Sequence, residues 1–464
     1  MAAPRNLGLR MLGVNAGRTL VTNIATILLG LGLSILLARG LGTEANGVYA
    51  LALLLPTMLA TLMNLGLGPA NVYHIGRGDL TPRQALFASL YAWTLLTAVG
   101  VIVTPLVLAW KGAEWFPGVP NAVLFMAVIS FPMTLLQGYF ASLLQGAQDF
   151  KRFNRLTIVT PFVTLVLSAI LILGFRTGVM GAVVAYTVGQ AISLGLAWCV
   201  LAPHVRPVGD RARLSFLETL GYLRTSISYG WKAHLSNMVA FINYRTDVYL
   251  VNLFMSPAYT GVYWVAIQMA ERMWIIANVV STVLIPRLSQ LHTEEEKRLA
   301  ITPIVTRFVL GTTTLACLLL ALISKPFIYL LFGEAFAGAR MALLLLLPGV
   351  LAGSVMKVIS NDFAARGKPE INSAVSAVTV VVNIVANVLL IPRYGINGGA
   401  IAATISYVIS LAMKLAIYPR FSHRPWYELL VPTKDDVALV REGTALVLGK
   451  IKSLAAARRD RRGA

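Results

Sequence analysis

Long apolar stretches separated by short polar segments dominate the chain from residue 18 to residue 418. Each stretch runs for about 20 residues, the length that an α-helix needs to cross the hydrocarbon core of a bilayer. The pattern predicts twelve spans, at roughly 18–38, 48–70, 86–109, 121–144, 156–175, 179–201, 232–254, 260–285, 303–324, 340–363, 372–392 and 397–418. The alternating ten-residue segments of a membrane β-barrel are missing from the sequence. We therefore expect an all-α, polytopic membrane protein.

Composition supports the same class. Of the 464 residues, 57% are hydrophobic and only 12% are charged, too few polar side chains to cover a soluble protein of this size. The first apolar stretch is too long for the core of a cleaved signal peptide, so we interpret it as the first span. We expect a multi-pass membrane protein.

The formal net charge of +20 could suggest a nucleic-acid partner, but the placement of the charges argues against one. Lys and Arg concentrate at the N-terminus, in the even-numbered loops and in the C-terminal tail. The odd-numbered loops hold only Arg39, Lys111, Arg176, Lys325, Arg340 and Arg393. Because cytoplasmic loops of membrane proteins are enriched in Lys and Arg, this bias places both termini in the cytoplasm, facing anionic lipid.

The two halves of the chain resemble each other. At an offset of 214 residues, "NGVYALA" (46–52) aligns with "TGVYWVA" (260–266), and Arg18 aligns with Lys232. At an offset of 217, "RTGVMGAVVAYTVGQAISL" (176–194) aligns with "RYGINGGAIAATISYVISL" (393–411), with eight of 19 positions identical. Both halves begin in the cytoplasm and hold six spans, so we expect two parallel six-helix bundles with a cavity between them.

These repeats divide the chain into four parts. The bundles are predicted at 1–205 and 231–420, joined by a cytoplasmic linker at 206–230 that is either a short amphipathic helix on the membrane surface or solvated chain. Residues 421–464 form a basic cytoplasmic tail. Its apolar residues at 437, 440, 447, 451 and 454 share one helical face, which indicates either an amphipathic helix on the leaflet or a frayed tail.

Signals for catalysis are poor. The five histidines, His74, His204, His234, His292 and His423, are scattered, and the two cysteines have no metal-ligand spacing. The sequence contains no GxxxxGK[ST] motif for a bound nucleotide. We expect no enzyme, no cofactor and no metal site.

Charged residues inside the spans are the candidates for function. The stretch "FINYRTDVYLVNLF" (241–254) carries Arg245 and Asp247, and span eight carries Glu271 and Arg272. Folding the two spans into a hairpin places all four at one depth, where each costs about 2.5–3.5 kcal/mol if it is unpaired. Arg245 and Asp247 point to opposite sides of a helix, which predicts that Arg245 pairs with Glu271 and Asp247 with Arg272. The pairs either lock the hairpin or leave at least one arginine lining a transport cavity.

Comparison of the two halves shows which of these charges the shared fold does not require. The positions that match the four charged residues in the first half are Leu31, Leu33, Thr57 and Met58, so the charges are additions to the second half. Arg18 and Lys232 match each other and either anchor their spans or line the cytoplasmic mouth. Lys357 in span ten either reaches the interface or lines the cavity. Gln137, Gln145, Asn383 and Asn387 are candidates for hydrogen bonds between helices.

Several phrases along the chain resemble one known family. They include "LLARGLGTEANGVYALAL" (36–53), "YRTDVYLVNLF…TGVYWVAIQMAERMW…STVLIPRLSQL" (244–291), "YLLFGEAFAGA" (329–339) and "RYGINGGAIAATISY" (393–407). They are similar to the polysaccharide-type flippases of the multidrug/oligosaccharidyl-lipid/polysaccharide (MOP) exporter superfamily, over most of the chain up to about residue 420. That family has the same arrangement of twelve spans in two lobes.

The resemblance implies a flippase that moves a polyprenyl-pyrophosphate-linked oligosaccharide from the inner to the outer leaflet of a bacterial plasma membrane. It implies that Arg245, Arg272 and Lys357 contact the phosphates or sugar, and that Asp247 and Glu271 hold those cations or take a coupling proton. Polysaccharide-assembly proteins are possible partners. The alternatives are a cation-coupled multidrug exporter, a lipid II flippase and a non-transporting scaffold of an envelope-polymer complex. Lipid II is disfavoured because, Arg18 and Arg39 apart, the first-half spans are nearly uncharged.

Overall fold

The structure is a computed structural model, and it describes residues 3–205, 215–275, 277–278, 295–366 and 368–433. Within these ranges the side chains of residues 3–20, 233, 295–300 and 369 are not described. The described chain is helical throughout and contains no strand, which confirms the predicted all-α class.

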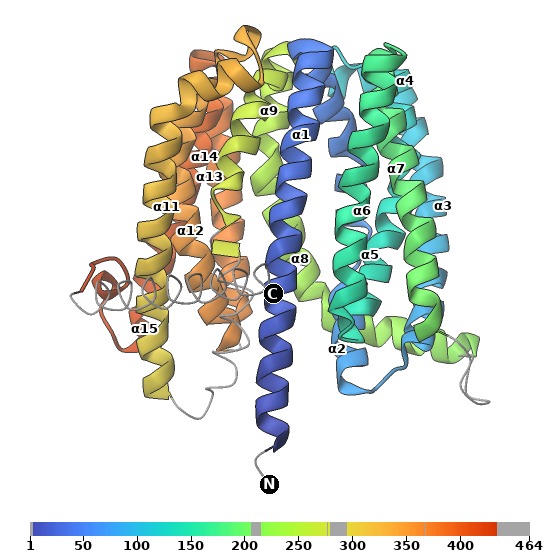
Figure 1. The fold of residues 1–464 in the computed structure, drawn as a ribbon, viewed down its shortest axis with the longest axis vertical. Coiled ribbons are helices and arrows are strands. Elements are labelled where there is room, and N and C mark those ends of the chain that lie inside the picture. Colours follow the sequence, from blue (N-terminus) through green and yellow to red (C-terminus); the bar gives the residue numbers. More distant parts are fainter. Residues whose placement is uncertain (1–2, 206–214, 276, 279–294, 367, 434–464) are drawn as a thin grey trace, which may run out of the picture.

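The first half of the chain contains α1 (Ala3–Leu62), α2 (Leu67–Arg77), α3 (Pro82–Trp115), α4 (Asn121–Val128), α5 (Ser130–Gly146), α6 (Phe150–Ala169), η1 (Ile170–Gly174), α7 (Gly178–Leu201) and η2 (Ala202–His204). The second half contains α8 (Phe216–Phe254), α9 (Pro257–Arg272), α11 (Glu295–Leu331), η3 (Glu334–Phe336), α12 (Ala339–Ala365), α13 (Pro369–Tyr394), α14 (Ile396–Ile417), α15 (Pro419–Ser422) and η4 (Trp426–Leu429). Most of the long helices run roughly along one common axis (Figure 1).

The helix α1 is a hairpin of two helical arms rather than one straight rod. Gly42 has φ 78° and ψ −176°, a conformation that glycine adopts freely and that other residues avoid. The chain reverses there, so the predicted spans one and two form the two arms. A second hairpin follows at the matching place in the repeat, where α8 ends at Phe254 and α9 begins at Pro257.

Successive turns alternate between the two ends of the molecule (Figure 1). The turn within α1 and the starts of α4 and α9 lie at the upper end in this view, and the start of α1 and the α2–α3 turn lie at the lower end. We call the lower end the basic end, because its turns and adjoining helix ends carry Arg77, Arg83, Lys151, Arg152, Arg155, Arg366 and Lys368. The other end is the opposite end.

Side-chain caps fix where several helices begin at the basic end. Thr81 and Gln84 form a capping box at the start of α3, and Ser215 and Glu218 form another at the start of α8. Asp149 accepts a hydrogen bond of 3.0 Å from the backbone N–H of Arg152 and so caps α6. The polar residues between the apolar stretches therefore act as helix start signals.

Nine helices of the described chain are long and apolar enough to cross a membrane, counting Val21–Leu62 as one. The predicted span seven lies in α8, a 39-residue helix that also contains residues 216–230 of the predicted linker. The first part of α8 lies across the basic end of the first half and packs against α2 (Figure 1). The predicted span eight begins in α9 and continues into residues 279–294, which lie outside the described residues.

The buried apolar side chains form two main clusters. One is built from residues 37–223 and centres on Phe131, Tyr139 and Phe140; the other is built mostly from residues 248–407 and includes Tyr263 and Phe336. This division agrees with two bundles, while the bundle boundaries at 205 and 231 stay a prediction. The amphipathic helix predicted in the tail falls on residues 434–464, outside the described residues.

The two halves meet in close contact at the opposite end. A Cβ added to Gly47 would lie 1.8 Å from the Pro257 carbonyl oxygen, and one added to Gly261 would lie 2.0 Å from the Thr43 carbonyl oxygen. Gly47 and Gly261 occupy matching positions in the repeat. The Asn46 side chain also donates to the Gly261 carbonyl at 3.3 Å. Only glycine allows the two backbones to approach this closely.

Nearby polar contacts hold the same end closed. Arg39 in α1 donates through Nε to the Leu331 carbonyl at 2.9 Å and through Nη2 to the Leu330 carbonyl. Both carbonyls belong to the last turn of α11, where they have no partner within the helix. Asn252 donates to the Pro117 carbonyl at 3.1 Å. The interior between the bundles is therefore closed at the opposite end.

We predict that Gly47→Ala lowers the thermal midpoint of the purified protein, because the added methyl group collides with backbone. Overpacking of this kind costs about 1–3 kcal/mol. Gly311→Ala is the matched control, since a Cβ at Gly311 in α11 meets no atom within 4 Å. Equal midpoints for the two variants would contradict the close contact at Gly47.

Candidate functional site

Arg245 and Glu271 form the ion pair that the hairpin predicts. Nη1 of Arg245 lies 2.9 Å from Oε1 of Glu271, and Nη2 lies 3.4 Å from Oε2, so the two groups face each other as forks. The Arg245 guanidinium also lies 5.4 Å from the ring centroid of Trp264. Both charged side chains are partly exposed, at 27% and 28%. The pair is thus accessible from the interior while its charges are compensated.

The predicted pair between Asp247 and Arg272 does not form. The Asp247 carboxylate is buried, and it accepts hydrogen bonds from the Tyr263 hydroxyl at 2.9 Å and the Val248 backbone N–H at 2.8 Å. Tyr263 was not among the residues predicted to form the site, although it lies in the repeated phrase "TGVYWVA". Two neutral donors therefore satisfy a carboxylate for which we expected a cation.

Arg272 faces a different helix. Its Nη1 donates to the Ile27 carbonyl in α1 at 2.8 Å, and its Nη2 donates to Oε1 of Gln268 at 3.3 Å. Successive residues of an α-helix point about 100° apart. Since Glu271 faces α8, the neighbouring Arg272 is turned toward α1. Its Nε is buried and has no hydrogen-bond partner among the described residues.

Lys357 joins the site from α12. Its Nζ donates to Oδ1 of Asn278 at 2.9 Å and lies 4.1 Å from the ring centroid of Trp274. Trp274 packs against Tyr244 and Tyr407, with ring centroids 5.6 and 5.7 Å away. These three aromatic residues link Lys357 to the Arg245–Glu271 pair. The sequence analysis missed them because aromatic residues inside a span are usually core residues.

Lys232 is not part of this cluster. Lys232 is exposed on α8, near the basic end. Arg18 lies in the first arm of α1, at the matching position of the repeat, but its side chain falls outside the described set. Their predicted place at the mouth of the cavity stays a prediction.

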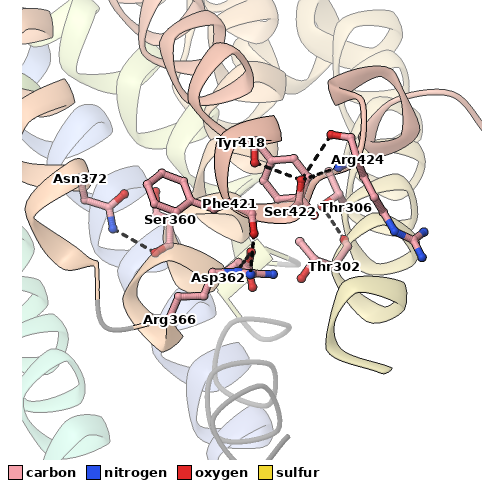
Figure 2. A network of polar contacts seen from close by, with 10 residues as sticks. All are labelled: Thr302, Thr306, Ser360, Asp362, Arg366, Asn372, Tyr418, Phe421, Ser422 and Arg424. Carbon is pink, nitrogen blue, oxygen red and sulfur yellow. Dashed lines mark hydrogen bonds and ion pairs between the residues drawn. The ribbon is translucent and has the colours of Figure 1, made fainter. Parts of the chain in front are cut away.

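A separate polar network ties the basic end of the second half together (Figure 2). Arg366 pairs with the fully buried Asp362 at 2.9 Å and donates to the Phe421 carbonyl at 3.1 Å. Asn372 donates to the Ser360 carbonyl at 3.0 Å, and Ser360 accepts from Lys414 at 2.6 Å. These bonds connect α12 with α13, α14 and α15. We therefore interpret the network as structural.

The predicted interhelical amides have mixed outcomes. Gln137 in α5 donates to the Gln190 carbonyl in α7 at 2.8 Å, so it does link two helices. Asn387 instead donates to the carbonyl and the side chain of Asn383 in its own helix, α13.

Two hollows meet beside Arg245. The first, which we call the apolar cleft, has a volume of about 300 Å³ and lies between the second arm of α1, α3 and α8. Its lining includes Leu54, Met58, Val103, Leu108, Phe241 and Arg245. Arg245 is the one charged residue of that lining, which consists of described residues.

The second hollow, which we call the polar cavity, has a volume of about 590 Å³ and lies between α1, α2, α5 and α8. Its polar lining includes Thr57, Thr61, Asn64, Thr134, His234 and Asn237. The lining residues, all of them described, include no Asp, Glu, Lys or Arg. Phe241 lines both hollows, so the apolar cleft and the polar cavity adjoin. A cavity between the two halves was predicted from the repeat, but these lining residues were not, because isolated Thr and Asn residues are common in spans.

Fold and site together define a multi-pass membrane protein with a polar interior between two helical halves. A family model described as "Polysaccharide biosynthesis protein" matches residues 12–292. The chain therefore belongs to the polysaccharide biosynthesis protein family, which confirms the family resemblance drawn from the sequence.

Individual relatives match the chain at 22–25% identity. The probable low-salt glycan biosynthesis flippase Agl15 of Haloferax volcanii is 22% identical over 193 residues, which are 41% of this chain and 41% of that protein. The uncharacterized membrane protein MJ1375 of Methanocaldococcus jannaschii is 25% identical over 379 residues, 79% of this chain and 88% of that protein. The match to Agl15 thus spans less than half of its length.

The fold has solved counterparts. The lipid II flippase MurJ, in an inward closed conformation, superposes with a TM-score of 0.71 at 14% identity and covers 86% of each chain. At this identity the likeness concerns the fold alone. It confirms the flippase-like helical fold that the family resemblance implied.

We predict that Tyr263→Phe destabilises the protein by about 1–3 kcal/mol, because it removes one of the two donors that satisfy the buried Asp247. The measurement is the free energy of unfolding in detergent. Tyr259→Phe in the same helix is the control, because Tyr259 is 51% exposed. A stability for Tyr263→Phe equal to that of the control would show that Asp247 does not depend on this hydroxyl.

Proposed function

We propose that this protein is a flippase for a polyprenyl-pyrophosphate-linked oligosaccharide, which it moves from the inner to the outer leaflet of the plasma membrane for surface polysaccharide biosynthesis. Such a lipid has a long apolar chain, a charged pyrophosphate and a polar saccharide. Neither the pyrophosphate nor the saccharide can cross hydrocarbon unaided, because desolvating them costs too much. A protein that moves the lipid needs a compartment for each part.

The order of the compartments carries the proposal. The apolar cleft lies beside Arg245, and the polar cavity adjoins the cleft at Phe241. A polyprenyl chain in the cleft would place its pyrophosphate near Arg245 and its saccharide in the polar cavity. Apolar surface, a cation and neutral hydrogen-bonding groups therefore follow one another in the same order as the polyprenyl chain, the pyrophosphate and the saccharide of the substrate.

Named residues take distinct roles in this proposal. Arg245 meets the pyrophosphate, and Glu271 holds its guanidinium in place while the site is empty. Lys357 supplies a second cation from α12. Arg18 and Lys232 stand near the basic end, where the headgroup enters from the cytoplasm. Because the opposite end is closed at Gly47 and Gly261, the headgroup enters from the basic end and leaves when the bundles rock apart at the other.

The alternatives fit the site less well. A multidrug exporter for cationic compounds needs free carboxylates in its cavity, whereas Glu271 is paired with Arg245 and Asp247 is buried under Tyr263. A lipid II flippase would share the fold, so the choice of saccharide is left to the substrate assay. Transport of this kind needs no catalytic residue, cofactor or metal ion.

We predict that Arg245→Ala lowers surface polysaccharide roughly tenfold or more at normal protein level, since a charge-assisted contact to phosphate contributes about 1.5–3 kcal/mol. The assay uses a strain without its own copy of the gene and measures both surface polymer and membrane-embedded protein. Lys325→Ala is the control, because Lys325 is exposed on α11 outside the site. Normal polymer in the Arg245 variant would contradict the proposal.

A charge swap separates binding from stability. Arg245→Glu combined with Glu271→Arg keeps an ion pair between α8 and α9 but moves the cation to another helix. We expect the double variant to restore the protein level that either single variant lowers, and polymer to stay low. Recovery of polymer together with protein would show that the pair only locks the hairpin.

A further inference from the structure

A third hollow lies wholly within the first half of the chain. This pocket, which we call the first-bundle pocket, has a volume of about 240 Å³ and lies between α5, α6 and α7. Its polar lining consists of Thr134, Gln137, Thr157, Thr160 and Ser193. None of the residues that line it is ionisable, and all of them are described. The volume is far more than a single buried water needs.

The first-bundle pocket opens into the polar cavity. Thr134 and Gly138 of α5 line both hollows. A Cβ added to Gly138 meets no atom within 4 Å, so the wall between the hollows is open at this position. A headgroup in the polar cavity can therefore extend between α5 and α6.

Hydrogen-bonding capacity is left unused at this pocket. Ser193 is 2% exposed, and its Oγ has no hydrogen-bond partner among the described residues. The neighbouring Gln190 donates to Thr134 at 3.0 Å and to Tyr186 at 2.9 Å, yet its Oε1 is likewise unpartnered in the described chain. Gln190 is not part of the pocket lining, but Ser193 is. Because buried polar groups are normally hydrogen-bonded, the unpartnered Ser193 hydroxyl points to a ligand with hydrogen-bonding groups.

The matching region of the second half is filled by aromatic side chains. In the repeat, Gln190 matches Tyr407, whose ring packs against Tyr244 and Trp274 at 5.8 and 5.7 Å between centroids. Aromatic side chains thus occupy the region beside α14 that corresponds to the polar face of α7. The two halves differ in chemistry: neutral hydroxyl and amide groups in the first, cations and aromatic rings in the second.

We infer that the first-bundle pocket is a saccharide subsite, which binds a sugar ring of the lipid-linked substrate while the second half binds its pyrophosphate. Sugar hydroxyls both donate and accept hydrogen bonds, as Thr, Ser and Gln side chains do. Phe153 and Leu156 add apolar surface for the C–H faces of the ring. A phosphate would find no cation here. This inference rests on the proposed function and assigns substrate selectivity to the first half.

The test compares two probe lipids, polyprenyl pyrophosphate and N-acetylglucosaminyl polyprenyl pyrophosphate. Equilibrium dissociation constants are measured by native mass spectrometry on the full chain in lipid nanodiscs. Ser193→Ala removes one hydroxyl, and Gly138→Leu fills the opening between the two hollows. Gly195→Leu is the matched control, since a Cβ at Gly195 in α7 also meets no atom within 4 Å and the residue is exposed outside the pocket.

We expect the unaltered protein to bind the glycosylated lipid at least about fivefold more tightly than the sugar-free lipid, the effect of one net hydrogen bond. Ser193→Ala and Gly138→Leu should abolish that preference and leave binding of the sugar-free lipid unchanged, which also shows that the variants fold. Arg245→Gln should weaken binding of both lipids.

Two results would overturn the inference. If the unaltered protein binds both lipids equally, or if the variants keep the preference, the pocket is a water-filled space only. If the unaltered protein binds neither lipid, the proposed function fails and this inference fails with it. The sugar-free lipid therefore distinguishes the two failures.

Discussion

A charged side chain inside a bilayer must find its compensation within the protein, because lipid supplies none. This constraint shapes the second half of the chain. Arg245 meets Glu271, Asp247 meets Tyr263, and Arg272 meets a backbone carbonyl of α1. Together these contacts join α9 to α8 and to α1. The charged side chains therefore require these helices to pack against one another, and they also make the interior polar.

These charged groups differ in whether they can still bind a ligand. Asp247 is buried with its donors and has little capacity for a further ligand. Arg245 is partly exposed beside two hollows of different polarity, and a guanidinium that is shared by a carboxylate can exchange that partner for a phosphate. A chain built from similar halves thus becomes asymmetric by a small number of substitutions at matched positions, such as Leu31 against Arg245 and Gln190 against Tyr407.

The sequence was informative where one periodic property decides the outcome. Apolar stretches indicated the helices, the repeat indicated two halves, and the hairpin depth predicted the contact between Arg245 and Glu271. The prediction of side-chain partners failed where the partner depends on the direction in which a side chain points around the helix axis. Asp247 and Arg272 share a depth, yet α9 turns Arg272 toward α1, and no spacing rule encodes that packing. The repeat predicted a cavity between the bundles, but not the polar residues that line it or the pocket within the first bundle, because these Thr, Ser and Asn residues come from several helices far apart in the sequence.

The glycine contact at the opposite end has a consequence for how such a protein could arise. Gly47 and Gly261 hold the same place in the two halves and touch each other across the interface. In a dimer of identical half-length chains related by a two-fold axis, one such glycine would pack against its own copy. A single mutation to glycine would then have opened both sides of the interface at once. After duplication and fusion of the gene, each half could change separately. The glycine contact would then stay symmetric while the residues around Arg245 became different from their counterparts in the first half.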